Sequence, residues 1–83
     1  MKLTIVSPQH EHEYTVQWIE AQTPMGALII QPDHAPIIMS LPVGSDFSFM
    51  LESTDEKKVI RLERPGFLEI TRKGAMALIG QDA

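Results

Sequence analysis

The fold class is decided by residues 46–63, which read DFSFMLESTDEKKVIRLE. Phe47, Phe49 and Leu51 occupy every second position, and the same spacing returns after the polar segment 53–56. Apolar side chains at alternate positions are typical of a β-strand that buries one face. The stretch therefore predicts two strands separated by a turn.

The same period of two recurs along the chain, with turn-forming Pro, Gly, Ser and Asp residues between the apolar segments. The six prolines leave no uninterrupted helical window, so no amphipathic helix is available to cover a sheet. An apolar sheet face must then be buried on another sheet. We expect an all-β fold, a small β-sandwich of about eight to ten short antiparallel strands. The expected strands lie near residues 2–6, 13–20, 28–31, 37–41, 46–52, 57–63, 67–72 and 75–79.

Length and composition limit the possible functions. The 83 residues predict one domain, residues 1–83, and 43% hydrophobic residues are ordinary for a globular protein. The absence of cysteine excludes disulfides and thiolate metal sites. A net charge of -4 without a basic cluster argues against nucleic acid as a partner. Since no apolar stretch approaches the roughly 20 residues of a membrane span, we expect no direct membrane insertion.

The pair His10 and His12 is a candidate metal site. In a strand the two imidazoles would lie on the same face, as metal ligands in small β-barrel enzymes do. A third ligand is needed, and His34 and Glu20 are the only obvious candidates. The alternative is a polar strand start, where alternating His and Glu keep a sheet edge soluble. The second interpretation is favoured, because nothing in the sequence brings a third ligand near.

The single tryptophan, Trp18, also has two interpretations. Its spacing from Tyr14 and Val16 favours a core or half-buried anchor, since a lone Trp usually helps to fill a small sandwich. The alternative is an exposed contact residue, because aromatic side chains are enriched at protein interfaces.

The segment 28–41, LIIQPDHAPIIMSL, contains two apolar runs around a Pro-Asp-His-Ala-Pro turn. Pro32 and Pro36 fix the backbone φ angle at both ends of this turn, which makes it stiff. A stiff loop loses little entropy when a partner binds it, so a contact loop is one interpretation. A purely structural crossover between sheets is equally compatible.

This segment resembles the N-terminal β-sandwich domain of the ε subunit of rotary F-type ATP synthases. That family has Pro-Gly-His-Ala-Pro between aliphatic runs, and a later Gly-Gly-Phe-Leu-Glu-Val element. The second element here reads PGFLEI at residues 65–70, and the opening residues 2–8 look like the family's first strand. Asp33 and Pro65 replace family glycines. The first motif is matched by Gly26, Ile30, Pro32, His34, Ala35, Pro36, Leu41 and Gly44.

The resemblance implies a non-catalytic rotor subunit of the central stalk, without a cofactor. Such a subunit links the γ subunit to the membrane c-ring in proton- or sodium-coupled ATP synthesis. It would lie at the cytoplasmic face of the inner (plasma) membrane as a peripheral part of the complex. The family often adds a C-terminal helical hairpin that inhibits ATP hydrolysis, and this property is not carried over, because the chain stops at Asp82-Ala83.

The resemblance also implies partner contacts. By matching to the family motif, the ring-facing positions are Gly26, Leu28, Pro32, Asp33, His34 and Pro36. Contact with γ requires exposed apolar residues of one sheet, for which Met39 and Phe67 are the candidates. Two alternatives stay open: a small metal-dependent β-barrel enzyme using His10 and His12, and a standalone β-sandwich interaction module. Metal content of the purified protein would reveal the first, and a neighbouring catalytic-subunit gene would argue against the second.

Overall fold

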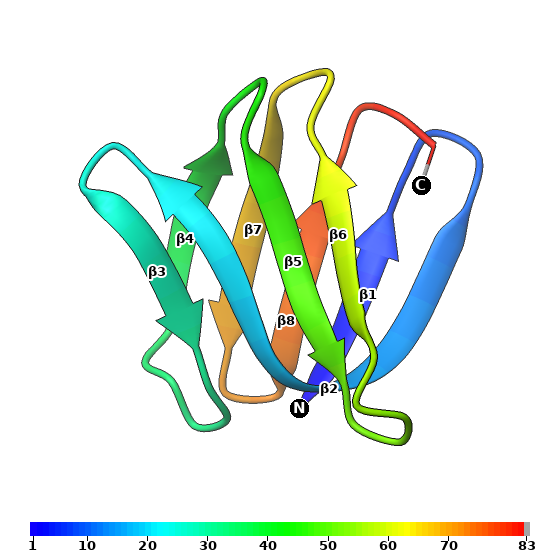
Figure 1. Cartoon of the computed structure of the whole chain (residues 1–83), viewed down its shortest axis with the longest axis vertical. Helices are drawn as coiled ribbons and strands as arrows, with labels where there is room; N and C mark the ends of the chain where they lie inside the picture. The colour runs from blue at the N-terminus through cyan, green and yellow to red at the C-terminus, as the bar shows by residue number, and fades with distance from the viewer. Residues whose placement is uncertain (83) are drawn as a thin grey trace.

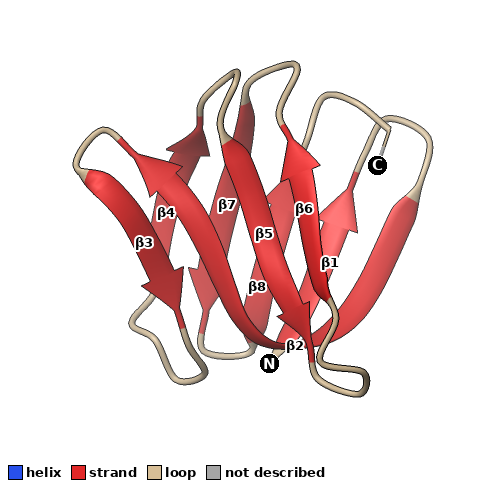
Figure 2. Ribbon diagram, in the orientation of Figure 1, coloured by secondary structure: helices blue, strands red, loops and turns tan. Residues whose placement is uncertain are grey.

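The structure, a computed structural model, describes residues 1–82 and consists there of eight strands without a helix (Figure 2). It therefore contains no helix long and apolar enough to cross a membrane within those residues. The all-β fold expected from the alternating pattern is confirmed. In chain order the strands are β1 (Lys2–Val6), β2 (Glu11–Thr23), β3 (Gly26–Ile30), β4 (Ile37–Leu41), β5 (Asp46–Leu51), β6 (Lys57–Arg61), β7 (Gly66–Thr71) and β8 (Gly74–Leu78).

The strands form two facing layers that share one long strand (Figure 1). The β8 sheet has the order β4-β7-β8-β1 and ends on the first half of β2. The β5 sheet contains β3, the second half of β2, β5 and β6. Because β2 crosses from one layer to the other, the two layers are one continuous hydrogen-bonded sheet that folds over its own core.

Strand pairing is antiparallel except between β1 and β8, which pair parallel with Leu3 opposite Ala75 and Val6 opposite Leu78. The expectation of antiparallel strands is therefore wrong for this one pair. A short hairpin connection enforces antiparallel pairing only between consecutive strands. Since β1 and β8 lie near the two ends of the chain, no short connection fixes their relative direction.

Strand β2 is longer than expected because it pairs with β1 in one layer and with β3 and β5 in the other, and a β-bulge lies inside it, between Val16 and Trp18. The extra residue shifts the alternation, so that Val16 and Ile19 are both buried while Trp18 is only half-buried. Of the two places expected for Trp18 as an anchor, core or half-buried, it takes the second, since it is half-buried and not part of the buried cluster. Instead, the Nζ atom of Lys57 lies 5.8 Å from the centre of its ring.

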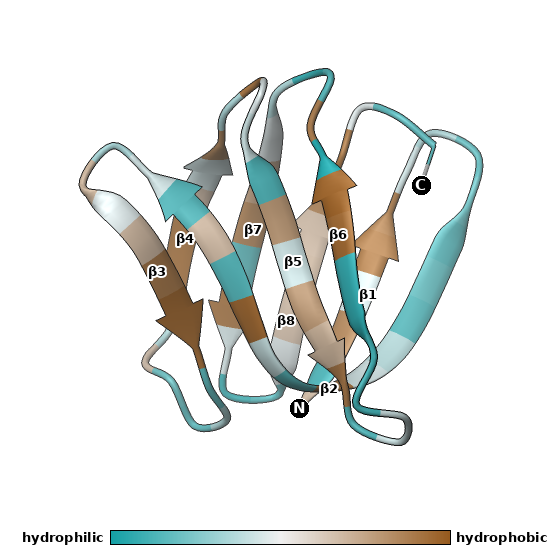
Figure 3. Cartoon of the chain, in the orientation of Figure 1, coloured by the Kyte–Doolittle hydropathy of each residue, from teal (hydrophilic) through white to brown (hydrophobic). Residues whose placement is uncertain are grey.

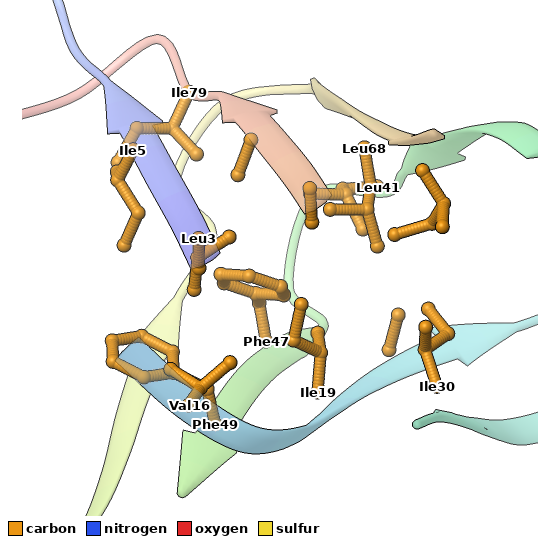
Figure 4. Close-up of a cluster of buried hydrophobic side chains, with 14 of the residues drawn as sticks. Leu3, Ile5, Val16, Ile19, Ile30, Leu41, Phe47, Phe49, Leu68 and Ile79 are labelled. Carbon is orange, nitrogen blue, oxygen red and sulfur yellow. The ribbon is translucent and has the colours of Figure 1, made fainter. Parts of the chain in front are cut away.

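The core lies between the two layers and is almost entirely aliphatic and aromatic (Figure 4). Phe47 and Phe49 are its largest fully buried side chains, with ring centroids 5.8 Å apart, and Tyr14 packs on Phe49 from the edge. Every buried side-chain N or O atom in residues 1–82 has a hydrogen-bond partner. Burial of this apolar surface is the main favourable term that holds the two layers together.

Candidate interaction surfaces

The outer face of the β8 sheet exposes a group of apolar side chains, which we call the outer patch and which consists of Ile38, Phe67, Met76 and Leu78. Strand register brings them together, because Phe67 lies opposite Leu78 while Glu69 lies between Ile38 and Met76. Ile38 is 70% exposed and Phe67 is 53% exposed. Adjacent exposed apolar side chains of this size are typical of a surface that another protein covers.

A shallow hollow adjoins the outer patch at its Met76 side. Its lining comes from β1, β7, β8 and the turn between β7 and β8, and includes Gly74. Lys2 and Lys73 border it on one side and Glu69 on another. The hollow is large enough to receive a side chain of a partner, with polar groups at its rim.

The expected contact segment 24–36 is not one loop in the structure. Strand β3 lies within it, and places the turn around Gly26 and the turn around Asp33 at opposite ends of the molecule (Figure 1). A flat partner surface cannot contact both turns at once.

The turn between β2 and β3 is held by the hydroxyl of Thr23. It accepts a hydrogen bond from the backbone N–H of Met25 at 3.2 Å and donates one to the Gly26 carbonyl oxygen at 2.7 Å. Gly26 has a φ of 115°, which a residue with a side chain rarely adopts. This rigid turn presents Met25 with 98% of its surface exposed. The sequence pattern Thr-x-x-Gly recurs at residues 71–74, where Thr71 makes the same pair of bonds.

The turn between β3 and β4 is stabilised from within. Asp33 adopts a φ of 68°, and the backbone N–H of His34 donates to the Gln31 carbonyl oxygen at 3.2 Å. The ring Nδ1 of His34 lies 2.7 Å from the Ala35 carbonyl oxygen, so that nitrogen carries the proton and donates. The second ring nitrogen, Nε2, is left for another partner. A cleft beside this turn is lined by Asp33, His34, Ala35, Pro36 and Arg72.

The eight predicted contact residues differ in accessibility. Leu28 and Met39 are partly buried and pack against the core, while His34 is half-buried in its turn. The exposed ones are Gly26, Pro32, Asp33, Pro36 and Phe67. Sequence reasoning missed Ile38, Met76 and Leu78, because 37–39 and 75–78 are apolar at every position and alternation therefore does not separate the inward side chains from the outward ones.

The histidine pair does not develop into a metal centre. The rings of His10 and His12 stack with centroids 5.8 Å apart, and His10 Nδ1 lies 3.6 Å from an oxygen of Asp82. The expected third ligand, His34, sits at the other end of the molecule (Figure 1). Within residues 1–82 no group of three or more His, Cys, Asp or Glu side chains could hold a metal ion.

One ion pair on the β5 sheet changes the pKa of one of its two members. Arg61 Nε donates to Asp46 Oδ1 at 2.7 Å, and this hydrogen bond, together with the opposite charge, raises the pKa of Arg61 above its ordinary value. Arginine is already charged at every physiological pH, so the pair fixes the ends of β5 and β6 without acting as a switch.

Comparison with known proteins gives these surfaces a context. Residues 1–79 match the family model described as ATP synthase, Delta/Epsilon chain, beta-sandwich domain. A chain in the cryo-EM structure of the Tetrahymena thermophila mitochondrial ATP synthase central stalk and c-ring superimposes with a TM-score of 0.74 at 16% identity. The match covers 98% of this chain and 63% of that chain, and such a low identity shows the fold alone. No curated protein sequence matches significantly. Because the family model covers nearly all of its residues, the chain belongs to the ATP synthase delta/epsilon chain family through its β-sandwich domain.

Proposed function

We propose that this protein, as one domain over residues 1–83, is a non-catalytic rotor subunit of an F-type ATP synthase. It connects the γ subunit of the central stalk to the membrane c-ring, as a peripheral subunit at the cytoplasmic face of the inner membrane. Membership of the delta/epsilon family supports this role. The observation that carries it is the outer patch, an apolar surface on a chain whose core is already complete.

The γ subunit binds the outer patch in this proposal. Interfaces of stable complexes have an apolar centre and a polar rim, and the hollow beside Met76, with its two lysines and Glu69, supplies such a rim. Phe67 was expected here as an exposed apolar residue of one sheet. Ile38 replaces Met39 as the candidate on β4, because Met39 packs against the core.

The c-ring contacts the end of the molecule that carries the β2–β3 turn. Met25 at this turn is almost fully exposed, and Val43 in the β4–β5 turn is exposed at the same end (Figure 1). We assign Gly26 to the ring contact. The turn at Asp33 and His34 lies at the other end and leads into β4 of the outer patch, so it belongs to the γ side.

Binding to γ is tested with the full chain and its cognate γ subunit. Truncating a hot-spot side chain at the centre of an interface costs more than about 1.4 kcal/mol of binding free energy. A cost of about 1.4 kcal/mol corresponds to a tenfold loss of affinity. We expect Phe67→Ser and Leu78→Ser each to weaken binding by about tenfold. Val59→Ser is the matched control, since Val59 is 56% exposed on the outer face of the other sheet. Failure of the unmodified chain to bind γ would contradict the proposed function.

Contact with the ring is tested by cross-linking in the assembled complex. The chain has no cysteine, so each introduced cysteine is the only one in this subunit. Met25→Cys should cross-link to the c subunit. Ser53→Cys, in the β5–β6 turn at the opposite end, should not. The reverse result would place the ring at the other end of the sandwich.

A further inference from the structure

The folded sheet has four free edges among the described residues. Strand β4 ends the β8 sheet on one side, and residues 11–14 of β2 end it on the other. Strands β3 and β6 are the two edges of the β5 sheet. The free edges of β3 and β4 lie on one side of the sandwich, and those of β2 and β6 on the other (Figure 1). A free edge exposes unpaired N–H and C=O groups that invite another strand.

The edges formed by β2 and β6 are protected by charge. Glu11 and Glu13 lie on the first, and Lys57, Lys58 and Arg61 lie on the second. Charged side chains, and lysines in particular, keep an edge strand from pairing with a foreign chain, because pairing would bury the charge. These two edges are built to stay in water.

The edges formed by β3 and β4 lack this protection. Neither strand contains a charged residue, and Asp33 is the only Asp, Glu, Lys or Arg between positions 21 and 45. Figure 3 shows the contrast between the hydrophilic first half of β2 and the apolar β3 and β4. Each of the two strands also exposes an isoleucine, Ile29 and Ile38. An uncharged apolar edge strand promotes aggregation of a free protein, whereas in a complex it can be covered by a partner.

We propose that the free edge of β4 pairs with an extended, uncharged segment of the γ subunit, which adds one strand to the β8 sheet. This inference rests on the proposed function. Ile38 connects the two surfaces, because it belongs to the outer patch and also lies in the middle of β4. A partner that covers the outer patch therefore runs past this edge, whereas the β3 edge belongs to the other sheet.

The backbone of β4 is available for such pairing. Residues 37–41 pair with β7 on one side, and no other backbone hydrogen bond within residues 1–82 reaches them. Pro36 and Pro42, which have no N–H group, stand just outside this segment, so all five residues between them keep their donors. In strand addition the main-chain bonds provide affinity and the alternate side chains provide specificity. The added segment needs apolar side chains on the face that it shares with Ile38.

Amide hydrogen exchange of the full chain, free and bound to γ, tests this inference. We expect the outward amides of residues 37–41 to exchange at least about tenfold more slowly in the complex, and those of β6 to be unchanged. Ile38→Lys adds the missing charge and should weaken γ binding by about tenfold. Val59→Lys, at an exposed position on the protected β6 edge, should leave it within about twofold.

Each other outcome overturns the proposal in a distinguishable way. If γ binds without slowing exchange in β4, strand addition is refuted while the rotor assignment survives. If γ does not bind at all, the proposed function fails and this inference fails with it. If the β4 amides are already protected in the free chain at high concentration, together with a dimer mass by sedimentation, the edge pairs with a second copy of the chain and not with γ.

Discussion

Replacing Gly66 by alanine probes a close backbone approach between β7 and β8 in the β8 sheet. Gly66 begins β7, directly before Phe67 of the outer patch. An added Cβ atom would lie 2.6 Å from the backbone carbonyl oxygen of Leu78 and 3.3 Å from Leu62 Cδ1. Ordinary van der Waals contact starts at 3.4 Å, so β7 and β8 would have to separate by about 0.8 Å at this point.

The expected loss follows from the nature of the obstructing atom. A flexible side chain could rotate away, but the Leu78 carbonyl is part of a strand paired on both sides. Overpacking of this kind costs about 1–3 kcal/mol. For a chain of this size, a loss of about 2 kcal/mol lowers the melting temperature by roughly 10 °C. The same separation of strands would also move Phe67 relative to Leu78 and, in the proposed complex, weaken binding to γ.

Thermal and urea unfolding followed by circular dichroism measure this loss. Gly80→Ala is the matched control, because its Cβ would approach Arg64 Cβ at 3.1 Å and Arg64 Cδ at 3.3 Å, so Arg64 would have to move by only about 0.3 Å to restore ordinary contact. We expect this control to stay within about 0.5 kcal/mol of the unmodified protein. Equal melting temperatures for Gly66→Ala and the unmodified chain would refute the close packing of β7 on β8.

Two further comparisons of variants test the buried core and the contact between Lys57 and Trp18. Phe47→Ala should destabilise the chain by about 3–5 kcal/mol, because the ring is fully buried, while exposed Phe67→Ala should cost less than about 1 kcal/mol. Urea midpoints compare the two, and similar losses would contradict the assigned core. Lys57→Gln should cost about 0.5–1 kcal/mol through loss of the cation over the Trp18 ring, and Lys57→Arg should restore it. A full loss with arginine would show that the charge over the ring is unimportant.

The alternating pattern was sufficient to predict the fold class and most strands, because one buried face per strand leaves a period of two in the sequence. It was insufficient at β2, where the bulge after Val16 changes the parity and moves Trp18 out of the core. A bulge adds one residue without a compositional signal, so periodicity alone does not reveal it. The parallel pairing of β1 with β8 depends on contacts between the chain ends, which local patterns do not encode.

The interaction surfaces were only partly predictable. The proline-flanked turn and a strand near 28–31 were found, but local patterns did not show that this strand, β3, places the turn at Gly26 and the turn at Asp33 at opposite ends of the molecule. Met39 was chosen over Ile38 on β4, since adjacent isoleucine, isoleucine and methionine give no indication of which side chain points inward. Only the register with β7 decides it.

The passage of β2 through both layers has a mechanical consequence. Two sheets held together only by apolar contacts can slide over each other, because the hydrophobic effect has no preferred direction. In this protein a slide would have to bend a continuous thirteen-residue strand and break its ladders with β1, β3 and β5. Force applied to one layer is thus passed to the other along covalent bonds, and the domain resists shear as a single stiff body.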